Sequence, residues 1–174
     1  MAAAMSPAVG PHNVFVYGSL MADEVVHVLL TRVPPSSPAL LPNFHRFSVK
    51  GRVYPAILPV ENKTVSGKVI KGLSDDELVI LDNFEDVEYV RTSVEISLLD
   101  TSEKMVAETY IWSNADDPDL YGEWDFEEWQ RLHMKDFLAM TKGFMDVLGE
   151  PDSTQTRVET YESFYYKEDS SSDV

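Results

Sequence analysis

The chain has 174 residues, of which 44% are hydrophobic and 11% aromatic, which is enough apolar material for one domain with a single buried core. Its net charge of −16 comes from 30 acidic residues against 14 lysines and arginines, a balance that repels nucleic acid and anionic membranes. The absence of cysteine excludes disulfides, thiolate nucleophiles and zinc–thiolate sites.

The N-terminal residues 1–12 are rich in alanine and proline and are predicted to form a flexible leader. They lack the basic region of a signal peptide and the arginines of a transit peptide. The chain also has no run of about 18 apolar residues that could span a membrane. We therefore expect a cytoplasmic protein with no membrane or nucleic-acid partner.

The first expected element is a short buried strand from Asn13 to Tyr17. Gly18 and Ser19 interrupt it, and Ser19 is predicted to cap a helix over Leu20 to Arg32. A cluster of prolines then ends that helix, because the residue before a proline disfavours helical geometry.

Three short strands are expected next, at Leu40 to Val49, Tyr54 to Val60 and Val65 to Gly72. Gly51 separates the first two, and a turn at Glu61-Asn62-Lys63 separates the last two.

A helix start is predicted at Ser74, because Glu77 three residues later completes a capping box. This helix should be short and end around Phe84 or Glu85. Two further strands follow, at Tyr89 to Leu99 and Met105 to Trp112.

A polar loop over residues 113–124 leads to the longest expected helix, from Asp125 to Leu148. Its apolar residues recur at three- and four-residue steps and mark one buried stripe: Phe126, Trp129, His133, Phe137, Met140, Phe144 and Leu148. Residues 150–174 are acidic and are expected to be partly disordered.

Together these elements predict an α+β domain over residues 13–149. Short strands without regular βαβ alternation indicate a mixed, largely antiparallel sheet that closes as a small β-barrel. A short helix after the first strand, a short mid-chain helix and a long C-terminal helix over residues 125–148 complete the expected domain.

The first segment that could carry chemistry is Tyr17-Gly18-Ser19-Leu20, where the strand turns directly into a helix. Glycine permits the turn and leaves the backbone amides accessible. Unpaired N–H groups at a helix start attract a carboxylate or a developing oxyanion. The pattern by itself also fits a tight structural turn with a serine cap.

The second such segment is Leu81 to Glu85. Glu85 is expected at the helix C-terminus, where the helix dipole disfavours a carboxylate. The acidic neighbours Asp82, Asp86 and Glu88 add like charge. Both effects raise a carboxyl pKa, as a general base requires, although spacing alone favours a solvated acidic loop after the helix.

Taken in order, these two segments and two more resemble the γ-glutamylcyclotransferase superfamily, most closely its plant avirulence-induced branch. The supporting segments are Gly51 to Ile57 and Val65 to Val69, and Tyr89-Val90-Arg91 also fits. The resemblance covers about residues 13–113 well, and Tyr121 to Met145 resembles the plant branch only.

The resemblance implies a compact mixed barrel and an enzyme of the acyltransferase (aminoacyltransferase) type. The α-amine of a small γ-glutamyl substrate would attack the amide carbonyl of its own side chain, giving 5-oxoproline and a free amine. Glu85 looks like the catalytic base and acid, and no cofactor or metal is implied. The implied substrate-binding residues are Val14, Phe15, Val16, Tyr17, Gly18, Ser19 and Leu20.

Other residues leave alternatives open. The histidines at positions 12, 27, 45 and 133 have no metal-binding spacing. Arg91 could pair with Glu85 or its neighbours, clamp a substrate carboxylate, or form a surface salt bridge. The main rival function is a non-catalytic, stress- or defence-induced protein that binds a ligand or partner on the same fold.

Overall fold

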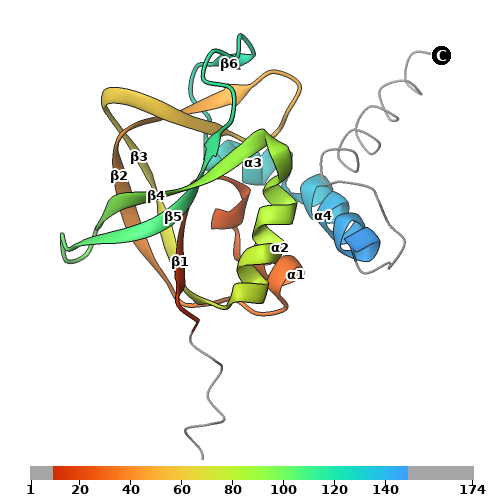
Figure 1. The fold of residues 1–174 in the computed structure, drawn as a ribbon. Helices are drawn as coiled ribbons and strands as arrows, with labels where there is room; N and C mark the ends of the chain where they lie inside the picture. The colour runs from red at the N-terminus through yellow and green to blue at the C-terminus, as the bar shows by residue number, and fades with distance from the viewer. Residues whose placement is uncertain (1–9, 149–174) are drawn as a thin grey trace, which may run out of the picture.

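Five strands close into a small barrel (Figure 1), seen in a computed structural model that describes residues 10–148. The strands follow the order β3-β1-β5-β4-β2, and β2 pairs with β3 to close the ring. Only β1 and β5 run parallel, so the predicted mixed, largely antiparallel barrel is confirmed. Their bounds are β1 (His12–Val16), β2 (Ser36–Val49), β3 (Ala56–Leu73), β4 (Tyr89–Leu98) and β5 (Lys104–Trp112).

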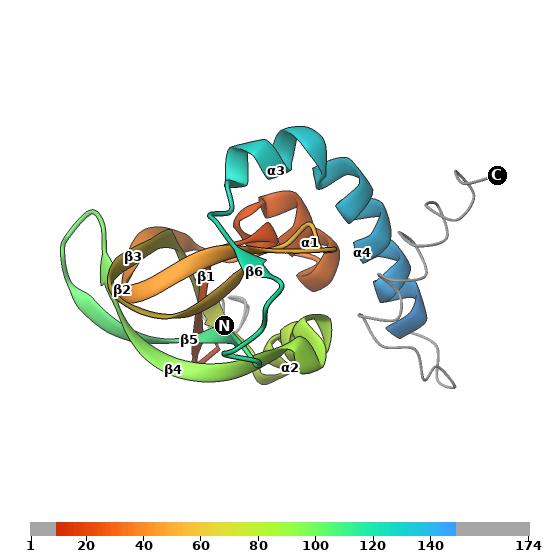
Figure 2. The same ribbon diagram turned by 90° about the horizontal axis from the view of Figure 1, so that it is seen from above.

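The helices gather on one side of the barrel (Figure 2). They are α1 (Asp23–Leu30), α2 (Asp75–Glu85), α3 (Phe126–Leu132) and α4 (Met134–Leu148), and a short strand, β6 (Leu120–Tyr121), pairs with the end of β2. One apolar cluster fills the barrel interior around Phe15 and Ile57. A larger cluster lies between the barrel and the helices and includes Trp129 and Phe137. The second cluster holds α2 and α4 against the same end of the barrel.

The predicted leader and acidic tail fall mostly outside the described residues, which exclude 1–9 and 149–174. Within the described part of the leader, β1 already begins at His12. The amide of Gly10 donates to the Gly72 carbonyl at 3.0 Å. The first strand therefore begins one residue before the expected domain boundary at residue 13.

The predicted turn at Glu61-Asn62-Lys63 is wrong, because β3 runs through it as one long strand. The register with β2 shifts here, from Pro42 opposite Thr64 to Phe44 opposite Pro59. Asn43 and Asn62 adopt positive φ angles of 63° and 67°, which asparagine tolerates better than most residues. The two strands therefore bulge together without reversing direction, which bends the hairpin around the barrel.

The first helix differs from its prediction at both ends. Ser19 does not cap it: residues Ser19–Met21 form a separate 3-10 helix, and α1 begins at Asp23 with no side-chain cap. At the other end Thr31 takes a left-handed conformation, with φ of 60°, directly after Leu30. The left-handed residue stops the helix before the prolines do.

The predicted long C-terminal helix is divided in two at His133, whose φ of −128° departs from helical geometry. The His133 amide still donates to the Trp129 carbonyl, and its own carbonyl accepts from the Phe137 amide. The predicted buried stripe continues across both helices, since Trp129, Phe137, Met140 and Phe144 are all buried. The bend lets α3 and α4 follow the curved side of the domain (Figure 2).

The predicted capping box at the start of α2 is confirmed. The Glu77 amide donates to Ser74 Oγ at 3.1 Å, and the Ser74 amide donates to Glu77 Oε1 at 3.0 Å. Arg32 also donates two hydrogen bonds of 2.7 Å to the Glu77 carboxylate. These contacts fix where α2 begins, and with it the position of its last residue.

Replacing Ser74 with alanine should therefore destabilise the domain by about 1 kcal/mol, the usual cost of losing an N-cap. For a chain of this size the thermal midpoint should fall by about 2–4 °C. Circular dichroism melting of the purified variant measures this shift. An unchanged midpoint would show that the cap does not hold the helix start.

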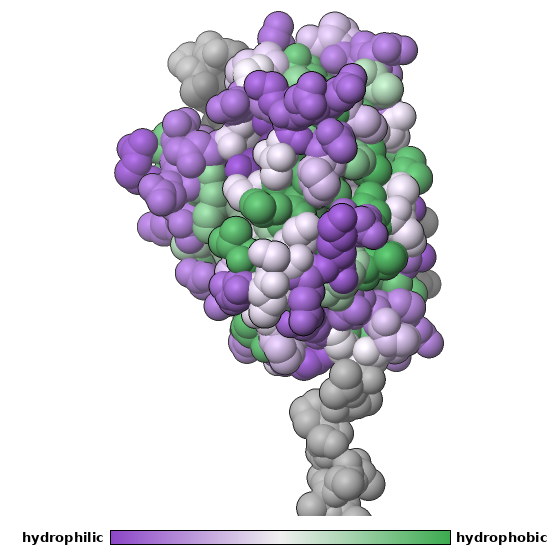
Figure 3. Space-filling view, turned by 90° about the vertical axis from the view of Figure 1, so that its left-hand side faces the viewer, coloured by the Kyte–Doolittle hydropathy of each residue, from purple (hydrophilic) through white to green (hydrophobic). Residues whose placement is uncertain are grey.

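The surface mixes polar and apolar side chains. On the face drawn in Figure 3, hydrophobic residues lie between hydrophilic ones. The most exposed large apolar side chains of the described residues include Val87 and Val106. None of the helices in residues 10–148 is both long enough and apolar enough to span a bilayer.

Candidate active site

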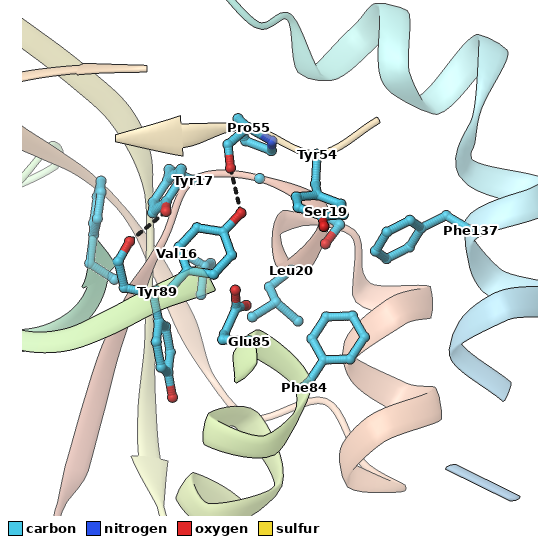
Figure 4. A pocket seen from close by; sticks show the side chains of 13 residues that line it. Val16, Tyr17, Ser19, Leu20, Tyr54, Pro55, Phe84, Glu85, Tyr89 and Phe137 are labelled. Carbon is cyan, nitrogen blue, oxygen red and sulfur yellow. Dashed lines mark hydrogen bonds between the residues drawn. The ribbon is translucent and has the colours of Figure 1, made fainter. Parts of the chain in front are cut away.

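One pocket opens between the end of β1, the end of α2 and the helices behind them (Figure 4). It contains about 420 Å³ not filled by protein atoms, part of which is open to solvent. Apolar and aromatic side chains dominate its wall. The lining residues are Phe15, Val16, Tyr17, Gly18, Ser19, Leu20, Tyr54, Pro55, Phe84, Glu85, Tyr89, Tyr110 and Phe137.

Glu85 is the last residue of α2, and its half-buried carboxylate points from the helix end into this pocket (Figure 4). Its direction is set by the residue before it. Phe84 is buried and packs edge-on against Phe137 and Phe144, with ring centroids 6.0 and 5.6 Å away. Because successive helical residues point about 100° apart, anchoring Phe84 in the core turns Glu85 toward the barrel. No other residue in the described lining has a charged side chain.

The opposite wall is the turn that follows β1. Gly18 packs so closely against Pro55 that a Cβ at Gly18 would lie 2.8 Å from the proline Cγ and Cδ. The 3-10 helix Ser19–Met21 then begins, and its first amides lack intrahelical partners by the geometry of a helix start. Backbone donors at this turn therefore lie in the same pocket as the Glu85 carboxylate.

Hydrogen bonds from two tyrosine hydroxyls hold the backbone segments between these two walls together. The Tyr17 hydroxyl donates to the Tyr110 carbonyl at 2.5 Å, and the Tyr89 hydroxyl donates to the Pro55 carbonyl at 2.6 Å. Both bonds are buried, and Figure 4 shows them on one side of the pocket. They tie the end of β1 to β5, and β4 to the segment that packs on Gly18.

The phenol groups of Tyr17 and Tyr110 stay neutral over the physiological pH range. Burial, and next the negative charge of Glu85, raise the pKa of Tyr17 well above its ordinary value. Burial, the hydrogen bond to Asp82 and the charge of Glu85 raise the pKa of Tyr110. Tyr17 and Tyr110 therefore act as hydrogen-bond donors and not as acids or bases near neutral pH.

The structure brings together the two predicted segments, since Glu85 and residues 15–20 line one pocket. Val14 is the exception among the predicted binding residues: its side chain is fully buried in the core and is not in the lining. Arg91 lies outside the lining as well, and its Nε is 3.5 Å from Asp82 Oδ1. It thus pairs with a neighbour of Glu85.

Six lining residues were not singled out as site residues from the sequence: Tyr54, Pro55, Phe84, Tyr89, Tyr110 and Phe137. Tyr54 and Pro55 belong to a segment that carries the family resemblance, which is a usable signal. Phe137 follows the core stripe of its helix, so nothing in its spacing distinguishes it from packing residues. Within residues 10–148 no three His, Asp or Glu side chains group as metal ligands would.

Comparisons with known proteins give a consistent result. A family model described as "Gamma-glutamyl cyclotransferase, AIG2-like" matches residues 14–131. AIG2-like protein D of Arabidopsis thaliana is 60% identical over 150 residues, which cover 86% of this chain and 99% of the relative. AIG2-like protein C of the same plant is 56% identical over 154 residues, covering 88% of this chain and 89% of that one.

Solved structures agree with the sequence relatives. A solution structure of an Arabidopsis thaliana protein superposes with a TM-score of 0.62 at 50% identity, covering 81% of this chain and 95% of the other. A gamma-glutamyl cyclotransferase structure shares the fold, with a TM-score of 0.52 at 21% identity over 59% of this chain and 67% of its own.

Proposed function

The chain belongs to the AIG2-like gamma-glutamyl cyclotransferase family, and from this premise we propose that its pocket cyclises a small γ-glutamyl amide to 5-oxoproline. One observation carries the proposal: a single carboxylate, Glu85, points into an aromatic pocket whose opposite wall is a turn with backbone donors. Few other groups are needed, because nucleophile and electrophile belong to the same substrate molecule.

The first step is removal of a proton. The α-amine of the γ-glutamyl group is protonated near neutral pH and cannot attack until it loses a proton. The Glu85 carboxylate accepts that proton as general base. Its place at a helix C-terminus, where the dipole disfavours negative charge, makes accepting the proton more favourable.

Ring closure follows on the opposite wall. The free amine forms a bond to the side-chain amide carbon, and the carbonyl oxygen takes up the electron pair as an oxyanion. Amides at Gly18 and Ser19 stabilise this oxyanion or hold the substrate α-carboxylate. When the oxyanion collapses, the bond to the departing nitrogen breaks, and the carboxylic acid of Glu85 donates a proton to that nitrogen. The regenerated Glu85 carboxylate then takes the second proton from the ring nitrogen and passes it to the released amine. The products are 5-oxoproline and a protonated amine, and Glu85 is again ionised.

The aromatic wall supports this chemistry in two ways. It excludes water from the reacting groups, which strengthens the interaction between the donors and the developing charge. The neutral phenols of Tyr17 and Tyr110 add no charge that would compete with Glu85 for the substrate amine.

A panel of γ-glutamyl compounds tests the proposal. The panel contains γ-glutamyl amino acids, γ-glutamylamines including an isopeptide-linked lysine, and other γ-glutamyl conjugates, with mass-spectrometric detection of 5-oxoproline. We expect at least one class to release 5-oxoproline together with an equimolar amount of free amine. Binding of a panel member without turnover would favour a non-catalytic ligand-binding protein on the same fold.

A further inference from the structure

Arg46 lies outside the pocket lining and donates a hydrogen bond to the backbone at the turn that contains Gly18. Arg46 lies on β2, and its Nη1 donates to the Tyr17 carbonyl at 2.9 Å and to the Ser66 carbonyl at 2.9 Å. The Tyr17 carbonyl belongs to the peptide that joins Tyr17 to Gly18. Arg46 therefore holds the peptide at which β1 ends and the pocket wall begins.

The orientation of that peptide decides where the Gly18 amide points. The described residues contain no cis peptide bond, and in a trans peptide the carbonyl and the following N–H point in opposite directions. Holding the Tyr17 carbonyl toward Arg46 turns the Gly18 N–H away from Arg46. Gly18 lines the pocket and Arg46 does not, which is the arrangement required for an N–H directed to the pocket side.

We infer that Arg46 is a positioning residue of the site, one that aims the Gly18 amide at the substrate by holding the Tyr17 carbonyl from behind. The role in turnover rests on the proposed function, whereas the aim of the amide can be measured without it. Arg46 itself touches neither substrate nor reacting atoms.

The position of Arg46 is costly, which indicates a role beyond fold stability. Its Nε is buried and has no hydrogen-bond partner among the described residues. Burial lowers the pKa of the guanidinium, although the charges of Asp125 and Glu123 act in the opposite direction. The guanidinium is half-buried, and the free energy lost by removing its charge from water is offset only in part by two neutral backbone acceptors.

Trp124 supports the same arrangement from the other side. The guanidinium carbon of Arg46 lies 5.6 Å from the Trp124 ring centroid, within the range of a cation–π contact. The indole N–H donates to the Val53 carbonyl at 2.9 Å. Val53 precedes Tyr54 and Pro55, so one buried side chain supports Arg46 and the segment that packs against Gly18.

Residual dipolar couplings of the backbone N–H bonds test the inference on labelled full-length protein. In Arg46→Met the Gly18 N–H vector should reorient, while those of Gly72 and Gly143 should not. Arg46→Lys keeps a charged donor near the Tyr17 carbonyl and should restore much of the original orientation. Arg46→Gln is the second uncharged variant, in case Arg46→Met does not fold.

Arg32→Met is the matched control, because Arg32 also donates to a backbone carbonyl, that of Gly72, and neither residue is in the pocket lining. It should lower stability and leave the Gly18 vector unchanged. An unchanged Gly18 vector in the folded uncharged variants of Arg46 overturns the inference.

Enzyme kinetics provide a second test of the role of Arg46. With any substrate found active, kcat/KM of Arg46→Met should fall about tenfold or more, as for loss of an aimed backbone donor, and Arg46→Lys should recover part of it. If the unmodified protein turns over no γ-glutamyl compound, the proposed function fails, while the Gly18 vector still decides whether Arg46 positions the amide.

Discussion

Replacing Glu85 with glutamine is expected to lower the rate of 5-oxoproline formation by about 10²–10⁴-fold, the usual contribution of a general acid–base group. Glutamine has nearly the same shape but can neither accept the α-amine proton nor return one to the leaving nitrogen. Glu85 is half-buried at a helix end and is not part of the apolar core, so the variant should remain folded.

Asp86→Asn is the matched control for this variant, because it removes the same charge one residue further along the chain. Asp86 has a positive φ of 60° and accepts a hydrogen bond from the Val87 amide, and asparagine suits both. Asp86 is not in the pocket lining, so its variant should retain most of the activity. Equal activity of Glu85→Gln and the unmodified protein would remove Glu85 from the mechanism.

Replacing Gly18 with alanine should have the second-largest effect. The added Cβ would meet Pro55 Cγ and Cδ at 2.8 Å, which is closer than real Cβ contacts, so the turn or the proline must shift. A displacement of about 1 Å at a reacting centre costs about 100-fold in rate. The overpacking itself should cost about 1–3 kcal/mol in the free energy of unfolding.

Gly143→Ala provides the matched control for the glycine. Gly143 lies in α4, and a Cβ there has no neighbouring heavy atom within 4 Å. Alanine should stabilise this helix by about 0.5–1 kcal/mol and leave the rate unchanged. Steady-state rates and urea unfolding of both variants separate the two effects. If Gly18→Ala keeps full activity, the close packing against Pro55 does not position the turn.

The parts of the fold that depend on local chemistry could be predicted from the sequence. Ser74 and Glu77 are three residues apart and cap each other, so the start of α2 is determined within one helical turn. The prediction around Asn62 was wrong because asparagine in a left-handed conformation fits a turn and a bulge equally well, and only the pairing with β2 decides between them. His133 interrupts the C-terminal helix without any helix-breaking residue, since the bend is set by packing on a curved core.

The site was predictable to a smaller extent. Neither Glu85 nor the turn at Gly18 is distinctive alone, and only the family resemblance links the two segments in the sequence. Tyr54 and Phe137 reach the pocket from other parts of the chain through tertiary packing, which spacing does not encode. Arg46 shows the limit most clearly: in the sequence it is one basic residue in a strand, and only the fold places it behind the Tyr17 carbonyl.

A crystal structure of the protein saturated with 5-oxoproline tests the central claim most directly. The product should lie between the Glu85 carboxylate and the turn at Gly18 and Ser19, with its ring nitrogen within hydrogen-bonding distance of Glu85 and an oxygen facing the turn amides. Product bound elsewhere, or bound in the pocket with Glu85 turned away from it, would contradict the account.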